Sequence, residues 1–154
     1  MSKAFTREDD ETEEPVVPTL VSPLPPGAKN YMTAEGAQRL RTELADMLDE
    51  KRPALARTAA TDPEAKRELA QLDQRIRYLQ QSLSTAEIVP PTGTLPDQVA
   101  FGSTVTVRDT KGVTSIYRIV GVDEADFERN EVSWLSPIAR ALLKNAPILL
   151  LDEA

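Results

Sequence analysis

The 154-residue chain contains no cysteine and no histidine. It therefore lacks thiol nucleophiles, imidazole bases and Cys/His zinc ligands, which excludes most hydrolase and redox centres. Any acid–base or metal chemistry would have to rest on carboxylates. No apolar run approaches the roughly 20 residues that span a bilayer, and the acidic start lacks the basic and apolar order of a secretion signal. We expect a cytoplasmic protein with no membrane segment, built as one domain or two small ones.

Positive charge is also scarce, since the formal net charge is −7. Phosphate neutralisation needs a basic surface, so we expect no independent sequence-specific DNA binding. Residues 1–28 hold two basic and six acidic side chains, a net charge of −4, which leaves −3 for the rest. Prolines at 15, 18, 23, 25 and 26 rule out a lasting helix or central strand there. We predict a disordered acidic and proline-rich tail over residues 1–28, with a polyproline-type docking ligand as the functional alternative.

Two stretches follow the spacing of amphipathic helices. The first is expected to begin after a Thr33 cap and to run to about Ala60, with Pro53 kinking it or loosening one turn. The second repeats apolar residues at the four–three spacing of a coiled-coil seam. Joined by a short connection, they predict an antiparallel coiled-coil hairpin over residues 29–89. The apolar positions are Ala37, Leu40, Leu44, Met47, Leu48 and Leu55, then Ala65, Leu69, Leu72, Ile76, Leu79, Leu83 and Ala86.

The connection between these helices reads "ARTAATDPEAKRE", residues 56–68. Asp62 can cap the second helix, with Pro63 at its first position and Glu64 in its first turn; Thr61 and Glu64 can instead form a capping box. The functional alternative is that Asp62 and Glu64 present two carboxylates to a metal, as weak catalytic candidates. Because capping explains both acids, we predict no catalytic and no metal-binding residue here.

The composition changes after Val89. Residues 90–98 contain three prolines and a glycine and predict a linker. Residues 99–109 and 113–123 alternate as two β-strands around a "TKG" turn, and Val132–Leu135 predicts another strand. Ser136 should cap a short helix that opens with Pro137, and "PILLL" predicts a last strand. We therefore predict a small α+β domain over residues 99–154, with Trp134 in its core.

Four segments resemble the Gre family of bacterial transcript cleavage and elongation factors (GreA/GreB), closest to the GreB type: "KNYMTAEGAQRLRTELADMLDEKRP", "LDQRIRYLQQSLSTAEIV", "FGSTVTVRD" and "YRIVGVDEADFERNEVSWLSPIARALL". The likeness covers about residues 29–144. It implies an α+β protein with an N-terminal coiled-coil hairpin and an FKBP-like C-terminal domain. It also implies that RNA polymerase is the partner, with the globular domain at the rim of the secondary channel and the hairpin directed toward the active centre.

Members of that family stimulate the polymerase to hydrolyse backtracked RNA, and their hairpin tip supplies acidic ligands to a second Mg²⁺. The family's tip motif, Gly-Asp-x-x-(Glu or Ser)-Asn-x-x-Tyr, does not occur in residues 56–68. The connection is also shorter than the family pattern by roughly a dozen residues, which retracts the tip by ~9 Å at helical rise. We therefore expect no cleavage stimulation, no enzymatic activity and no cofactor. Mg²⁺ would take part only if Asp62 and Glu64 act at the polymerase active centre.

The resemblance also suggests binding residues. Polymerase contact is predicted at Asp123, Ser136, Pro137 and Arg140. The 3′ segment of backtracked RNA is a further possible partner, and the candidates for its phosphates are Arg52, Arg57, Arg75 and Arg77. The alternative for these arginines is a solvated helix face paired with neighbouring acids.

Three functions are consistent with the resemblance. The chain is a channel-binding regulator without cleavage stimulation, an active cleavage factor that uses Asp62 and Glu64, or an interaction module that has lost polymerase binding. Peptidyl-prolyl isomerase activity would rest on analogy of fold alone, and we discount it. The sequence also ends where the family continues into a Gly-Asp turn and two further strands, so we expect one closing strand to be missing and a sheet edge to be uncovered.

Overall fold

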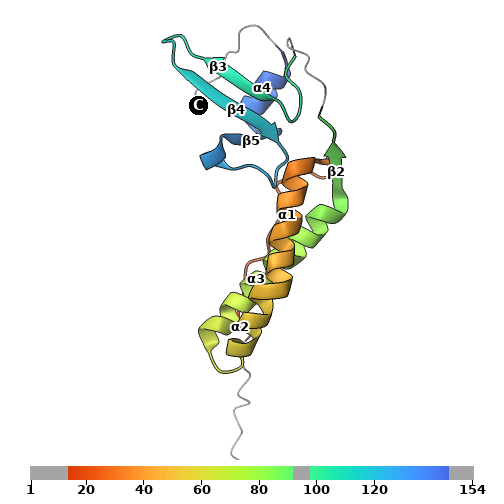
Figure 1. Ribbon diagram of the computed structural model, residues 1–154, viewed down its shortest axis with the longest axis vertical. Coiled ribbons are helices and arrows are strands. Elements are labelled where there is room, and N and C mark those ends of the chain that lie inside the picture. The colour runs from red at the N-terminus through yellow and green to blue at the C-terminus, as the bar shows by residue number, and fades with distance from the viewer. Residues whose placement is uncertain (1–13, 92–97, 146–154) are drawn as a thin grey trace, which may run out of the picture.

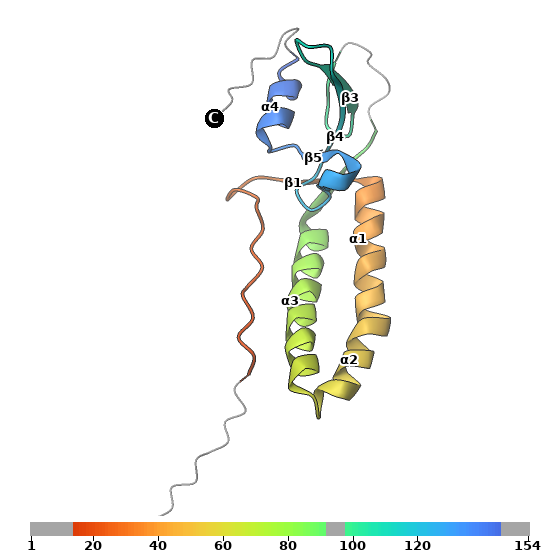
Figure 2. The same cartoon turned by 90° about the vertical axis from the view of Figure 1, so that its left-hand side faces the viewer.

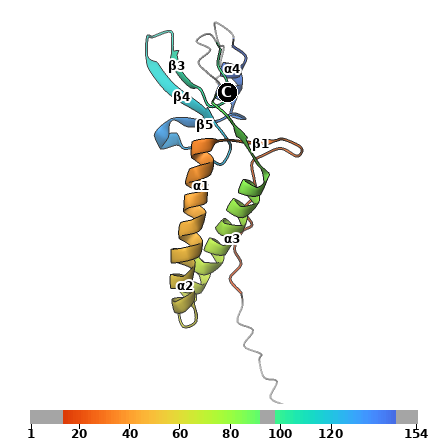
Figure 3. The ribbon, with the colours of Figure 1, turned by 45° about the vertical axis from the view of Figure 1, so that its right-hand side comes forward.

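The computed structural model describes residues 14–91 and 98–145 as an α+β arrangement of helices and two small sheets. Its helical part is a hairpin whose two arms lie side by side, and its globular part sits on the open end of that hairpin (Figures 1 and 3). The first arm consists of α1 (Ala34–Asp46), a π-helical turn (Met47–Lys51) and α2 (Arg52–Ala59). The second arm is a single helix, α3 (Pro63–Thr85).

The first arm begins at the predicted cap. The hydroxyl of Thr33 accepts a hydrogen bond from the backbone N–H of Gly36 at 3.0 Å, and Glu35 lies in the first turn. Both features stabilise a helix N-terminus, because they satisfy an unpaired donor and place negative charge at the positive end of the helix dipole. The predicted cap is therefore confirmed.

The predicted disturbance at Pro53 takes the form of the π-helical turn. The N–H of Arg52 bonds to the carbonyl of Met47, five residues back instead of four. Proline has no N–H and its ring clashes with the carbonyl four residues earlier, so a wider turn just before it relieves the clash while the helix continues. The arm runs on into α2 without a break, as predicted, with one loosened turn.

The apolar core of the hairpin is concentrated near its open end. Of the two adjacent residues predicted to face the seam, Met47 is buried as expected, whereas Leu48 is 39% exposed; both lie in the π-helical turn. No residue of α2 is buried, so packing thins out toward the closed end. The buried members are Met32, Ala37, Leu40, Met47, Ile76 and Leu79, with Leu44, Leu72, Tyr78, Leu83 and Ala86 packed against them.

A two-stranded parallel ribbon closes the open end of the hairpin, and it was not predicted. It pairs β1 (Asn30–Thr33) with β2 (Ala86–Val89), in the register Asn30 to Ala86. The second helix was expected to include Ala86, but it ends at Thr85 and the chain turns extended. A parallel pair needs a long crossover, and the whole hairpin is that crossover.

The globular part is a three-stranded sheet with one helix against it. Strand β4 (Thr114–Val120) lies in the centre, antiparallel to β3 (Thr104–Arg108) and parallel to β5 (Glu131–Ser133). Helix α4 (Pro137–Leu143) begins at Ser136, whose hydroxyl accepts a hydrogen bond from Ala139 N–H at 3.3 Å. The core comprises Ile119, Ala139 and Leu142, with Val99, Phe101, Val105, Val107, Val132, Trp134, Ile138 and Leu143 around them.

The two predicted strands, the cap and the short helix are confirmed, and Trp134 packs against the predicted core. The predicted strand over residues 132–135 is shifted, since β5 covers Glu131–Ser133. The predicted "PILLL" strand lies outside the described residues, as do residues 92–97 of the predicted linker. Residues 14–28 contain no helix or strand and run along α3 toward β1 (Figure 2).

The cap at the closed end of the hairpin can be tested by mutation. The carboxylate of Asp62 accepts a hydrogen bond from Glu64 N–H at 3.0 Å and so caps α3. Asp62→Asn should leave the free energy of unfolding nearly unchanged, since asparagine caps equally well, whereas Asp62→Ala should lower it by about 1 kcal/mol. Urea denaturation followed by circular dichroism measures both, with Glu64→Gln as the control. Equal losses for Asn and Ala would contradict a cap.

Candidate functional site

The loop between β4 and β5 fastens the globular part to the hairpin. Its Glu124 is only 4% exposed. One carboxylate oxygen accepts hydrogen bonds from Thr33 N–H at 3.1 Å and Gly121 N–H at 2.6 Å, and the other accepts one from the Thr33 hydroxyl. Burying a carboxylate is costly unless its oxygens are hydrogen-bonded, and charged acceptors make the stronger bonds. Thr33 therefore caps α1 and holds the loop at the same time.

Two glycines allow the loop to come this close. A Cβ on Gly36 would lie 1.6 Å from Oε1 of Glu124, and a Cβ on Gly121 would lie 2.2 Å from the carbonyl oxygen of Tyr31. Neither space can hold a methyl group. Glycine is therefore required at both positions by close approach, which explains a helical glycine that would otherwise cost helix stability.

Asp123, the neighbour of Glu124, bonds to α3. Its two carboxylate oxygens accept hydrogen bonds from the hydroxyls of Tyr78 and Ser82. Burial raises the pKa of Tyr78 to about 12, and the adjacent Asp123 carboxylate adds to the rise by accepting the phenol proton and by its charge. Both effects disfavour the phenolate. We call this set of contacts between residues 121–126, Thr33, Gly36, Tyr78 and Ser82 the joint.

Further contacts surround the joint. Arg118 of β4 pairs with Glu35 at 2.9 Å, and Arg39 of α1 pairs with the buried Glu131 at 3.2 Å. The Tyr31 ring of β1 packs edge-on to Trp134, with ring centroids 5.4 Å apart. Such aromatic pairs add to the apolar burial around them. Side chains from both parts thus interlock, so the joint fixes the direction in which the hairpin points from the globular part.

The predicted polymerase-binding residues fall in two places. Ser136, Pro137 and Arg140 come together on the first turns of α4, where Pro137 and Arg140 are exposed. Asp123 lies in the joint, with both oxygens engaged by α3. These positions do not test polymerase contact, but they give Asp123 a role within the chain.

The four candidate arginines for RNA also divide. Arg52 pairs with Asp73 at 2.8 Å, and Arg75 pairs with Glu43 at 3.0 Å and lies over the Tyr78 ring. These pairs link the two arms of the hairpin, as the alternative of a paired helix face predicts. Arg57 and Arg77 are exposed, and among the described residues neither makes an ion pair.

The two acids at the closed end have different surroundings. Asp62 is occupied as a cap, and Glu64 is exposed in the first turn of α3. Within residues 14–91 and 98–145, no three acidic side chains come together in a way that would hold a metal ion. The same residues include no helix with the length and apolarity that a membrane span requires.

Comparison with known proteins shows which family the chain resembles. Residues 94–147 match the family model described as the C-terminal part of transcription elongation factor GreA/GreB. The chain is 36% identical to transcription elongation factor GreB of Neisseria meningitidis serogroup B over 129 residues, which is 75% of this chain and 79% of that protein. It is also 36% identical to transcription elongation factor GreA of Trichlorobacter lovleyi over 126 residues, covering 73% and 79%.

The chain belongs to the GreA/GreB family of transcription elongation factors. Among solved structures, it is similar to GreA factor homolog 1 (Gfh1) of Thermus thermophilus, with 24% identity, coverage of 75% and 83%, and a TM-score of 0.40. Residues 121–126 of the joint lie within the stretch that matches the family model. The other joint residues belong to β1 and the hairpin, outside that stretch.

Sequence reasoning missed most of the joint. It singled out Asp123 but neither Glu124, Tyr78 nor Ser82, because a contact between residues 41 to 91 positions apart leaves no periodic signal. The available clue was Gly36, a glycine in the first turn of an otherwise strong helix. Such a glycine indicates close approach by another segment.

Gly36→Ala tests the joint. In an ordinary helix this change stabilises by up to about 1 kcal/mol, but here the new methyl group collides with Glu124. We expect a lower free energy of unfolding by urea denaturation. Glu124→Ala removes the colliding atoms, so the double variant should lose less stability than the two single losses combined. Stabilisation by Gly36→Ala alone would show that the loop does not sit on α1.

Tyr78 provides a second test, by titration. The folded pKa rises from 10.0 to about 12, so the neutral phenol is favoured in the folded state. Its stabilisation is full below pH 10 and is lost as the pH rises through the interval up to about 12. The difference in phenolate absorbance between the native chain and Tyr78→Phe should show this transition. Asp123→Asn should lower the pKa by removing the negative charge; an unchanged pKa would separate Asp123 from Tyr78.

Proposed function

We propose that this GreA/GreB-family chain binds RNA polymerase at the secondary channel and regulates elongation without stimulating transcript cleavage. The observation that carries the proposal is the closed end of the hairpin, where residues 60–62 alone connect α2 to α3. Its Asp62 carboxylate is used to cap α3. Among the described residues, no three acidic side chains come together as a group that could hold a metal ion.

Metal placement explains why such a tip would not support cleavage. Mg²⁺ requires oxygen ligands at about 2.1 Å in near-octahedral geometry, so a ligand set even a few ångströms away contributes nothing. Two-metal hydrolysis also depends on holding the reacting atoms in alignment, and small misplacements cost large factors in rate. A carboxylate held by its own helix is poorly placed to leave that cap for a metal.

Polymerase contact is assigned to the first turns of α4. Pro137 and Arg140 are exposed there, and Ser136 holds the helix start. We propose that β3, β4, β5 and α4 correspond to the FKBP-like domain of the family and that the two arms form its coiled-coil hairpin. Asp123 would act indirectly, by holding α3 at the angle that brings the hairpin into the channel.

The exposed arginines would face nucleic acid. Arg57 lies near the closed end and is available for phosphate oxygens of the RNA 3′ segment. Arg77 lies on the face of α3 that residues 14–24 run along, so RNA would reach it when that segment is displaced. Arg52 and Arg75 would instead keep the two arms together through their acidic partners. The proposal therefore separates the four arginines into two RNA contacts and two cross-arm pairs.

Competition on the polymerase tests the function. Purified chain should shift core RNA polymerase in a native gel, leave backtracked complexes uncleaved, and slow cleavage by an active factor when present in excess. Pro137→Ala with Arg140→Ala should weaken the shift by at least about tenfold, since exposed arginine and apolar contacts at an interface commonly carry that much. Lys111→Ala, which removes an exposed charge at the turn between β3 and β4, is the matched control.

Two outcomes would reject the proposal in different ways. Cleavage well above the rate of polymerase alone, lost in an Asp62→Asn, Glu64→Gln variant, would make the chain an active factor. No shift of polymerase by a chain with native circular dichroism would make it an interaction module with another partner.

A further inference from the structure

Residues 14–24 lie along the outer side of α3, on the side away from α1 (Figure 2). We call this segment the strap. Residues 14–17 line a groove with the part of α3 from Lys66 to Arg77. Thr19, Leu20, Ser22 and Leu24 face its later turns, from Gln74 to Thr85. The strap therefore runs parallel to α3 over most of the length of that helix.

The spacing of the strap fits such a course. Ten residue steps at about 3.1 Å in a polyproline-type chain span about 31 Å, and the nineteen steps from Lys66 to Thr85 at 1.5 Å span about 28 Å. Burial alternates over residues 14–18, since Pro15 and Val17 are half-buried whereas Val16 between them is 94% exposed; residues 18–23 are exposed, and Leu24 is half-buried again. The prolines fix dihedral angles in advance, which lowers the entropy lost on docking.

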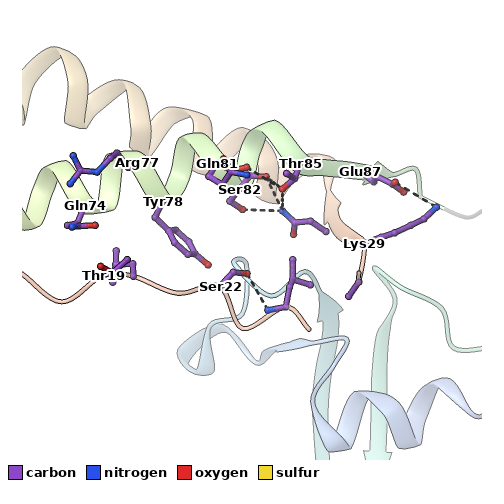
Figure 4. Close-up of a pocket in the computed structure, with 14 residues that line it drawn as sticks. Thr19, Ser22, Lys29, Gln74, Arg77, Tyr78, Gln81, Ser82, Thr85 and Glu87 are labelled. Atoms are coloured by element: carbon purple, nitrogen blue, oxygen red, sulfur yellow. Dashed lines mark hydrogen bonds and ion pairs between the residues drawn. The ribbon is translucent and has the colours of Figure 1, made fainter. Parts of the chain in front are cut away.

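The strap also reaches the joint. Figure 4 shows Tyr78 directed from α3 toward Ser22 of the strap, and the same phenol donates its hydrogen bond to Asp123. Leu24 N–H bonds back to the Ser22 hydroxyl at 3.2 Å, and Ala28 N–H bonds to the carbonyl of Pro25 at 3.1 Å. These turns bring the chain from the strap into β1. Strap, hairpin and globular part thus meet around one side chain.

The contact is incompletely filled. A cavity of about 550 Å³ remains between strap and helix, lined by Leu20, Leu24, Tyr78, Gln81 and Lys29 among others. Atoms that face empty or water-filled space lose the dispersion contacts that tight packing supplies. The strap is therefore held more weakly than the hairpin core, as a segment that detaches and returns must be.

We propose that residues 14–24 are an intramolecular ligand of the outer face of α3, and that their docking stiffens the joint by covering Tyr78. The occupant of this groove is the chain's own acidic, proline-containing segment. Its charge fits the site, because Glu14 lines the same groove as Lys66, near the start of α3, and Arg77, further along that helix. A nucleic-acid or protein partner that binds along this face would have to displace the strap.

Paramagnetic labelling tests the docking in the isolated full chain. The chain has no cysteine, so a single introduced cysteine carries the label. A nitroxide on Gln74→Cys, beside the strap, should cause loss of the amide signals of the non-proline residues between 16 and 24. The same label on Gln38→Cys, exposed on α1, should leave them intact. Intact strap signals in both variants would overturn the proposal.

Matched double variants test its effect on the joint. Val17→Asp with Leu24→Asp changes two half-buried positions, whereas Val16→Asp with Val21→Asp adds the same charge at positions 94% and 81% exposed. The first pair should restore the amide signals of the strap in the Gln74-labelled chain. It should also lower the titration midpoint of Tyr78, because water then reaches the phenol ring. The second pair should have neither effect. Restored signals with an unchanged Tyr78 midpoint would show that docking of the strap does not affect the joint. Equal effects of both pairs would show that the strap does not dock through its half-buried residues.

Discussion

The buried carboxylate of Glu124 is the contact on which the rest of the arrangement depends. It joins the loop after β4 to the residue that caps α1, so the start of the hairpin and the position of the globular part are set by one side chain. Removing a partner from a buried, hydrogen-bonded charge commonly costs several kcal/mol, far more than breaking an exposed ion pair. The exposed ion pairs around it, such as Arg118 with Glu35, can therefore adjust the angle between the hairpin and the globular part, but they do not set it. The glycines at 36 and 121 follow from this carboxylate, since each leaves the space that its loop needs.

Much of the fold could be predicted because its signals are local. The Thr33 and Ser136 caps, the loosened turn before Pro53 and the alternation of β3 and β4 all depend on neighbours within a few positions. What could not be predicted depends on distant neighbours. The β1–β2 ribbon consists of four-residue strands whose pairing requires the hairpin to close first. Leu48 lies in the π-helical turn and is 39% exposed, and a fixed spacing of three and four residues predicts neither the turn nor the exposure.

In the candidate site, too, local features could be predicted from the sequence and distant contacts could not. Asp62 and the arginines were recognised as candidates because charge and spacing are visible in the sequence, and the structure then distinguished capped or paired side chains from exposed ones. Asp123 was recognised from a family resemblance, and its partners Tyr78 and Ser82 became evident only from the fold. A resemblance thus located an important loop without saying whether its acids face outward to a partner or inward to the hairpin.

Packing along the hairpin is densest at its open end and becomes sparser toward its closed end. Most buried residues lie toward β1 and β2, where the joint holds the hairpin, whereas α2 contributes none and the closed end has the buried Ala65, the Asp62 cap and exposed ion pairs. A change of length or composition at the closed end would therefore disturb few buried contacts and leave the joint intact. In the function proposed above, polymerase contact in the globular part and the composition of the tip can therefore change independently. We propose that this chain uses that independence, because buried hydrogen bonds form its joint while its closed end is only a three-residue connection capped by Asp62.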